Sequence, residues 1–367
     1  MAFSFFKKND NKPAAHVNEK YYHLKVREVI RETSDAVSLV FDTPSKPMVY
    51  QSGQFLTLIM QVNGEKIRRA YSLCSSSFVD EFPAVTVKKV EGGKMSTWIN
   101  DTVKAGDVIE VMEPMGHFTT TYKAEQARTI VLLGGGSGIT PLMSITKSVL
   151  DQEPNSKVVL IYANRNLESV IFRTTLEEMQ QTFGNRLRVV HILDVPPVNW
   201  SGASGIPTVD LLSKLVSQEV NEVSKAEYFI CGPQGMMDNA ENALLGLSIP
   251  KEKIRKESFT STSDKKPVDV VSPSAASGLE VKVIYDGDEH VFTVPSGKTI
   301  LETALGLDID LPYSCQSGLC TACRGKCLSG EVHLDESEGL SQSEINEGYV
   351  LTCVGHPKSP GVVIEIG

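Results

Sequence analysis

Long apolar runs, a secretory signal and an excess of basic charge are all missing from this 367-residue sequence. No hydrophobic run approaches the roughly 18 residues that a membrane-spanning helix needs. Residues 1–11 contain Lys7 and Lys8, but neither an apolar core nor a cleavage site follows them. The formal net charge of −9 argues against nucleic acid as a partner. We therefore expect a cytoplasmic protein that binds neither membrane nor nucleic acid.

The acidic excess is confined to one end of the chain. Residues 279–367 carry 14 acidic and 5 basic side chains, whereas the remainder is neutral overall. Residues 260–278 are rich in Ser, Lys, Pro and Ala and are interpreted as a flexible linker. The composition, 41% hydrophobic and 22% charged, is that of a globular protein with room for several cores. The sequence thus predicts a tail at 1–20 and separate units before and after the linker.

Two different hydrophobic patterns precede the linker. Residues 21–123 show short alternating strands such as 55–61 and 85–90, with turn signals at Asn63-Gly64 and Gly92-Gly93, which predicts an antiparallel β-barrel. In residues 124–259, buried strands at 129–133, 157–163, 187–193 and 228–230 alternate with helical patterns at 141–150 and 174–182. This alternation is typical of an α/β domain with a parallel sheet. After the linker, 279–285 and 289–294 form a predicted hairpin and 299–306 a short helix.

Four of the seven cysteines lie within 13 residues, which is too crowded for a disulfide framework. The spacing Cys315-x4-Cys320-x2-Cys323, followed 29 residues later by Cys353, is typical of a plant-type [2Fe–2S] cluster with four thiolate ligands. A tetrahedral zinc site is the alternative, and this combination of spacings disfavours it. Cys327 is either a replacement ligand or a small buried side chain.

A glycine loop lies between a predicted strand and a predicted helix. Such a loop exposes N–H donors to a pyrophosphate, and the start of the helix adds favourable partial charge. A proline stands where the dinucleotide-binding fingerprint has its last glycine. The residues of this candidate site are Gly134, Gly135, Gly136, Ser137, Gly138, Thr140 and Pro141.

A second candidate site is the run Arg69, Ala70, Tyr71 and Ser72 at the end of a predicted strand. It offers a cation for a phosphate, a flat ring for stacking and a hydroxyl for a flavin nitrogen. Taken alone, it is equally compatible with a surface arginine and a core tyrosine.

Together these segments resemble the ferredoxin–NADP⁺ reductase superfamily, in the branch that carries a C-terminal plant-type ferredoxin. The chain is most similar there to reductase subunits of phenylacetyl-CoA epoxidases. The resemblance implies that 93–97 closes on the FAD pyrophosphate, that 231–233 lies beside the nicotinamide and that 257–259 reaches back to the flavin. It adds these cofactor-binding residues: Gly93, Lys94, Met95, Ser96, Thr97, Cys231, Gly232, Pro233, Glu257 and Phe259.

The resemblance also implies a multidomain fold with an antiparallel β-barrel flavin domain (21–123), an α/β nucleotide domain (124–259) and an α+β, β-grasp ferredoxin domain (279–367). FAD is favoured over FMN. The implied acceptor is an oxygenase, first the diiron phenylacetyl-CoA epoxidase, and the alternative acceptors are a ring-hydroxylating dioxygenase or another hydroxylase. A different functional alternative for the chain is a non-catalytic redox sensor that uses its cluster for switching. A reduced nicotinamide donates two electrons as a hydride, whereas the cluster accepts one electron at a time. The flavin is therefore expected to accept the pair and to pass the electrons on singly. Hydride transfer to a flavin needs no protein acid, and no catalytic residue is assigned.

The second strand of the α/β domain informs the choice of nucleotide. In dinucleotide-binding sheets its end faces the adenosine ribose, where an acidic residue accepts from a 2′-hydroxyl and an arginine accommodates a 2′-phosphate. Here Arg165 follows the strand, Arg173 lies further on, and the first acidic residue is Glu168. This favours NADPH over NADH, unless Arg165 is simply a solvated loop residue.

Overall fold

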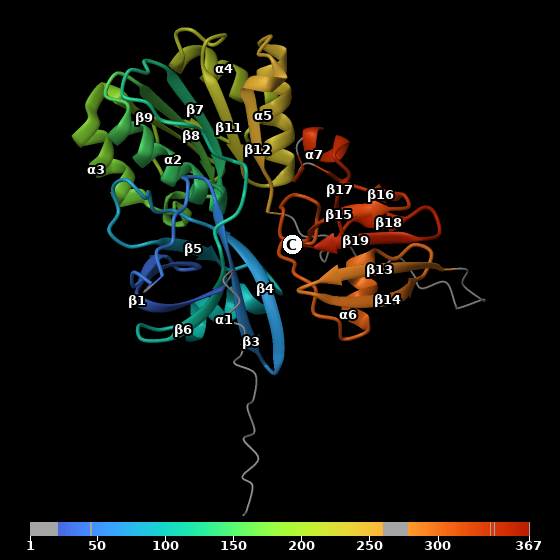
Figure 1. Cartoon of the computed structure of the whole chain (residues 1–367). Helices are drawn as coiled ribbons and strands as arrows, with labels where there is room; N and C mark the ends of the chain where they lie inside the picture. Colours follow the sequence, from blue (N-terminus) through green and yellow to red (C-terminus); the bar gives the residue numbers. More distant parts are fainter. Residues whose placement is uncertain (1–20, 45, 260–277, 338, 341, 367) are drawn as a thin grey trace, which may run out of the picture.

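The computed structural model describes residues 21–44, 46–259, 278–337, 339–340 and 342–366. The predicted tail at 1–20 lies outside this part, and so does the predicted linker at 260–278 except for residue 278. Three larger sheets and one two-stranded sheet organise the described residues into three units (Figure 1).

The first unit is a curled antiparallel sheet with strand order β4-β3-β6-β1-β2-β5. Asn63 and Gly64 both have positive φ, 53° and 84°, as the tight β3–β4 hairpin requires. A bridge between Leu73 and Val85 brings the two ends of the sheet together, so the predicted barrel is confirmed as a curled half-barrel. Its elements are β1 (Tyr21–Thr33), β2 (Ala36–Phe41), β3 (Phe55–Val62), β4 (Glu65–Ser72), β5 (Ala84–Lys88), α1 (Lys94–Thr102) and β6 (Val108–Met112).

The second unit is a parallel sheet with strand order β10-β9-β8-β7-β11-β12. Helices α2 and α3 pack in the apolar core on one face, and α4 and α5 pack in the core on the other. This confirms the predicted α/β layout. Its elements are β7 (Thr129–Gly135), α2 (Ile139–Gln152), β8 (Lys157–Asn164), α3 (Arg173–Phe183), β9 (Leu187–Leu193), β10 (Ala203–Ser204), α4 (Val209–Glu219), β11 (Glu227–Cys231), α5 (Gln234–Gly246) and β12 (Ile254–Glu257).

Helix α2 begins two residues before its predicted start, directly after the 3₁₀ turn Gly136–Gly138. Pro141 is therefore the third residue of the helix. A proline is compatible with this place because the first N–H groups of a helix have no intrahelical acceptor.

The third unit combines the mixed sheet β14-β13-β19-β15-β17 with the two-stranded sheet β16-β18. Thr299 caps α6 by accepting from the N–H of Glu302, and the buried face of α6 packs into the core of the sheet. Its elements are β13 (Leu279–Tyr285), β14 (Asp288–Val294), α6 (Ile300–Gly306), β15 (Arg324–Ser329), β16 (Val332–Leu334), α7 (Gln342–Asn346), β17 (Tyr349–Leu351), β18 (Gly355–Pro357) and β19 (Val362–Ile366).

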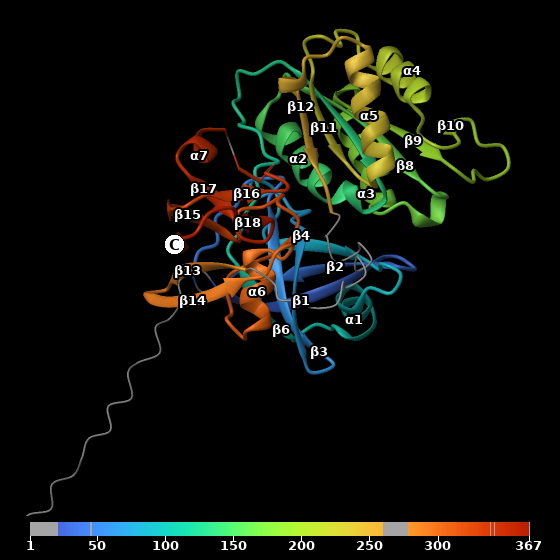
Figure 2. The ribbon, with the colours of Figure 1, turned by 90° about the vertical axis from the view of Figure 1, so that its right-hand side faces the viewer.

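The third unit lies against the first, beside β3 and β4, in both views of the chain (Figures 1 and 2). This contact brings the cysteine-rich loop between α6 and β15 to the end of β4. None of the helices in the described ranges has the length and apolar character needed to cross a membrane.

Candidate functional site

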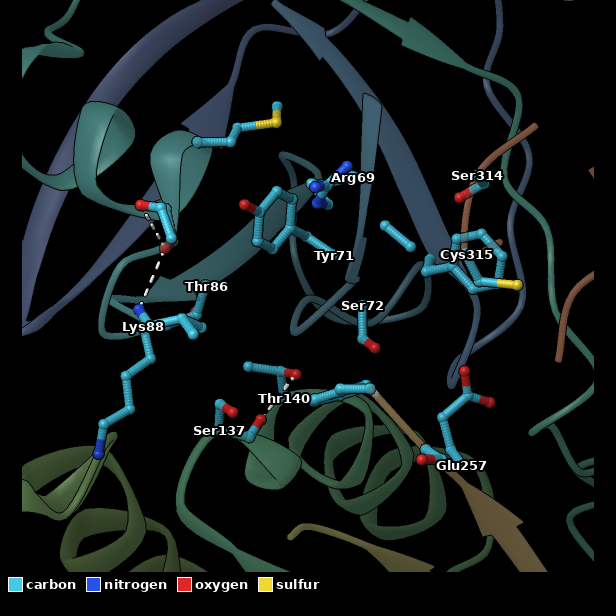
Figure 3. Close-up of a pocket in the computed structure, with 18 of the residues that line it drawn as sticks. Arg69, Tyr71, Ser72, Thr86, Lys88, Ser137, Thr140, Glu257, Ser314 and Cys315 are labelled. Atoms are coloured by element: carbon cyan, nitrogen blue, oxygen red, sulfur yellow. Dashed lines mark hydrogen bonds between the residues drawn. The ribbon is translucent and has the colours of Figure 1, made fainter. Parts of the chain in front are cut away.

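A cavity of ≈ 210 Å³ opens where the three units meet (Figure 3). The first unit contributes β4 and the start of α1, the second contributes the glycine loop and the end of β12, and the third contributes the cysteine loop. The structure thus brings together these predicted site residues: Arg69, Ala70, Tyr71, Ser72, Gly93, Lys94, Met95, Ser96, Ser137, Thr140, Glu257, Phe259, Cys315 and Cys320.

Strand β4 presents a cation and an aromatic ring to the cavity. The Arg69 guanidinium donates to the backbone oxygen of Arg68 at 2.8 Å, and it makes no ion pair within the described part of the chain. Its charge is therefore available to a phosphate. The Tyr71 ring lies in the middle of the cavity (Figure 3), and burial raises the pKa of its hydroxyl, so the ring stays neutral. Both features fit a flavin nucleotide.

The start of α1 is open to an anion. Gly93 is the N-cap and supplies no side-chain acceptor, and the first turn contains no acidic residue. The free N–H groups and the helix dipole at this end favour a pyrophosphate. Ser96 instead accepts from the N–H of Val90 at 3.1 Å, which orders the turn before the helix. Thr97, by contrast, is exposed and does not line the cavity.

The glycine loop packs tightly against the segment after β11. A Cβ at Gly138 would lie 2.0 Å from the backbone oxygen of Cys231, and one at Gly135 would lie 2.8 Å from the Pro233 ring. Glycine is therefore required for this close approach. Ser137 reaches the cavity from this loop and Thr140 from the first turn of α2, and the Thr140 hydroxyl donates to the backbone oxygen of Ser137 at 3.0 Å.

Glu257 ends β12, directly beside Cys231 in the sheet register. Its side chain points into the cavity on the side where Cys315 lies (Figure 3). Burial raises the pKa of Glu257 to about 8, and the charge of Cys315 adds to this shift. This raised pKa favours the protonated carboxyl group, which can donate a hydrogen bond there.

The four predicted ligand cysteines lie together. Interaction with the neighbouring Cys320 and Cys353 thiols lowers the pKa of Cys315, and interaction with Cys315 and Cys323 raises the pKa of Cys353, so the four side chains are neighbours. The N–H of Ser317 donates to the Cys315 sulfur at 3.4 Å. This donor set, four thiols with an N–H group directed at a sulfur, fits a [2Fe–2S] cluster.

Two glycines allow the close packing of the cysteine loop, and the remaining cysteine, Cys327, lies outside it. Gly318 has a φ of +74°, and a Cβ at Gly339 would lie 2.8 Å from the Cys320 nitrogen. Cys327 lies apart from the other cysteines on β15, where its sulfur contacts the backbone oxygens of Ser329 and Gly330.

The structure does not bring every predicted residue to the cavity. Arg165 is exposed just after β8 and has no ion-pair partner among the described residues. Arg173 begins α3 and forms an ion pair with Glu177 at 3.1 Å. Thr86 and Lys88 line the cavity from one face of β5, a signal that strand alternation could have supplied. Further lining residues that the sequence analysis missed are Phe55, Val90, Ser314 and Leu319.

Comparisons with known proteins agree with this architecture. Residues 22–120 match the oxidoreductase FAD-binding domain, 132–242 the oxidoreductase NAD-binding domain, and 283–358 the 2Fe-2S iron-sulfur cluster binding domain. Phthalate dioxygenase reductase has a similar fold, with a TM-score of 0.57 and 22% identity over 94% of this chain and 98% of that one.

Two relatives match along almost their whole length. The ferredoxin reductase component of 3-ketosteroid-9-alpha-monooxygenase from Rhodococcus rhodochrous is 37% identical over 93% of this chain and 96% of its own. One of the subunits of 1,2-phenylacetyl-CoA epoxidase from Escherichia coli (strain K12) is 35% identical over 94% of this chain and 97% of its own. The chain therefore belongs to the ferredoxin–NADP⁺ reductase superfamily, as an oxidoreductase with FAD-binding, NAD-binding and [2Fe–2S] domains that supplies electrons to a separate oxygenase component.

Proposed function

We propose that this reductase oxidises NADPH in the cytoplasm and supplies electrons to a diiron phenylacetyl-CoA epoxidase. The observation that carries the proposal is the full-length similarity to the matching component of the Escherichia coli epoxidase. When bound, FAD takes up the two electrons of a hydride and releases them singly, and the cluster carries one at a time. The protein's part is to hold the two cofactors and the nucleotide at fixed positions.

We assign the cofactor sites as follows. Arg69 and Tyr71 bind the flavin, the start of α1 binds its pyrophosphate, and the glycine loop with 231–233 binds the nucleotide. Cys315, Cys320, Cys323 and Cys353 ligate the cluster. The domain limits that we propose are 21–123, 124–259 and 279–367.

Reconstitution with purified oxygenases tests the choice of partner. We expect turnover of phenylacetyl-CoA with the diiron epoxidase proteins, and a rate that falls as salt rises, because the third domain has a strong net negative charge. The second candidate is the 3-ketosteroid 9α-monooxygenase, favoured by the similarity to its reductase. If the protein supported turnover by the 3-ketosteroid 9α-monooxygenase and none by the epoxidase, the monooxygenase would replace the epoxidase as the assigned partner. A rate independent of salt would contradict electrostatic docking.

The preference for NADPH is assigned to Arg165. It is exposed after β8 and not engaged in an ion pair among the described residues, whereas Arg173 is paired with Glu177. An arginine–phosphate contact contributes about 1.5–3 kcal/mol, which corresponds to roughly a tenfold to hundredfold preference for NADPH. We expect Arg165→Ala to raise the KM for NADPH by about this factor and to leave the KM for NADH unchanged.

Steady-state kinetics with both nucleotides measure this preference, with Arg173→Ala as the control. Equal or higher kcat/KM with NADH in the unmodified protein would remove the case for NADPH. The same would follow if Arg165→Ala left the preference unchanged.

A further inference from the structure

The iron–sulfur domain covers the outer face of the β3–β4 hairpin. Ile59 is directly opposite Arg68 in this hairpin, and opposed residues of an antiparallel pair share a face. Phe55 and Ile59 of that face pack with Cys320 and Ala322 in one buried apolar cluster. The cysteine loop is therefore packed on the first domain itself.

Arg68 contacts the segment just before the cysteine loop. Its Nη2 donates to both carboxylate oxygens of Asp310, at 2.8 and 3.0 Å, and its Nη1 donates to the backbone oxygen of Leu311 at 3.1 Å. The guanidinium carbon lies 4.8 Å from the centroid of the Tyr313 ring. Only 3% of the Arg68 side chain is exposed. The planar guanidinium thus holds residues 310–313 in one orientation.

This segment leads directly into the cavity. The Thr57 hydroxyl of β3 donates to the Ser314 hydroxyl at 2.7 Å, and both groups are buried. Ser314 and Cys315 then line the cavity, where Tyr71 also lies, three residues after Arg68 on the same strand. One strand therefore contacts both the flavin cavity and the segment that precedes the first cysteine.

We propose that Arg68, Asp310, Thr57 and Ser314 form an interdomain latch, which sets the position of the cysteine loop against the flavin cavity. The latch thereby sets the rate at which electrons pass from flavin to cluster. Arg68 is a positioning residue, because it neither lines the cavity nor contacts a cysteine. The inference rests on the electron-transfer function of the family and is independent of the nucleotide and of the oxygenase.

Three variants of the holoenzyme test the latch. Arg68→Met keeps an apolar stem of similar length and removes the guanidinium. Asp310→Asn is the milder change, since the Asp310 side chain is 60% exposed and no domain core depends on it. Lys66→Met is the matched control, because Lys66 reaches the same carboxylate at 3.4 Å but its side chain is 43% exposed. Arg68→Met and Lys66→Met each remove one positive charge near Asp310. Only Arg68→Met also removes the buried guanidinium contacts of the latch.

Two kinds of measurement separate positioning from folding. Stopped-flow absorbance follows flavin reduction by the nucleotide and then cluster reduction. Hydrogen exchange reports protection of the backbone amides in 66–70 and 310–315. We expect Arg68→Met and Asp310→Asn to leave flavin reduction unchanged and to speed exchange in both segments. Cluster reduction should slow about tenfold in Arg68→Met and by a smaller factor in Asp310→Asn, whose amide oxygen still accepts one hydrogen bond. The double variant should be no slower than Arg68→Met, because that substitution already removes every contact of the guanidinium with residues 310–313.

Several outcomes would overturn the latch. One is a cluster-reduction rate in Arg68→Met equal to that of the unmodified protein. Another is equal slowing in Lys66→Met, which would indicate a general loss of charge instead. Slower cluster reduction with unchanged hydrogen exchange would also reject positioning. These readouts need no oxygenase, so they are unaffected if the proposed partner proves wrong.

Discussion

Replacing Cys320 with serine is expected to remove the cluster and to reduce electron delivery to cytochrome c to background. Cys320 is 2% exposed and its thiol contacts Cys315. A serine hydroxyl is a harder ligand than thiolate and ionises far less readily, so it does not hold iron–sulfide. Iron content and the visible spectrum measure the cluster, and cytochrome c reduction measures delivery.

Flavin reduction by the nucleotide should survive in the same variant. Cys320 lines the cavity, so the cluster and flavin sites are joined in space although the predicted linker separates them in sequence. Serine is smaller than cysteine, and Arg69, Tyr71 and the start of α1 are unchanged by it. We therefore expect full flavin content, with a shifted flavin spectrum because its surroundings have changed.

Cys327→Ser is the matched control for this prediction. The half-buried Cys327 sulfur contacts the backbone oxygens of Ser329 and Gly330, away from the other cysteines, and this position should tolerate a hydroxyl. An unchanged cluster spectrum in Cys320→Ser, together with loss of the cluster in Cys327→Ser, would show that the assigned ligand set is wrong.

Replacing Gly138 with alanine is expected to slow reduction by the nucleotide by about fivefold to a hundredfold. The added Cβ would lie 2.0 Å from the Cys231 oxygen and 2.7 Å from the Gly232 nitrogen, so the glycine loop and 231–233 must separate. Overpacking of this kind costs about 1–3 kcal/mol, and about 1.4 kcal/mol corresponds to a factor of ten. Stopped-flow reduction with NADPH measures the effect, and chemical reduction with dithionite should remain normal.

Gly235→Ala is the control for Gly138→Ala. Gly235 lies at the start of α5, only three residues after Gly232, and a Cβ there would meet no atom within 4 Å. Alanine also has the higher helix propensity, so stability should not fall. If Gly138→Ala were reduced as fast as Gly235→Ala, the close approach of the two segments would not matter for nucleotide binding.

Each strand and helix that local patterns located by residue range is present in the structure. The Asn63-Gly64 and Asp286-Gly287 pairs mark hairpins because both residues of each pair adopt positive φ, which few other residues tolerate. The buried apolar runs form β7, β8, β9 and β11 of the parallel sheet. Helices cover both faces of such a sheet, so apolar side chains are buried on either side of each strand. Element ends were less accurate, as the early start of α2 shows.

The sequence by itself determined the chemistry that each segment offers. Cysteine spacing predicts a cluster because the four ligands come from one short loop and one nearby strand end. The glycine loop and the Arg69–Ser72 run are also short, so the residues that act together are close in the chain.

Only the tertiary structure decided how these segments meet. Arg68 and Asp310 are 242 residues apart, and Thr57 and Ser314 are 257 apart. No periodicity or spacing links positions so distant, because their contact depends on how two finished domains pack. The same packing placed Thr86, Lys88, Ser314 and Leu319 on one cavity, and it brought Cys315 beside the pocket that Tyr71 occupies.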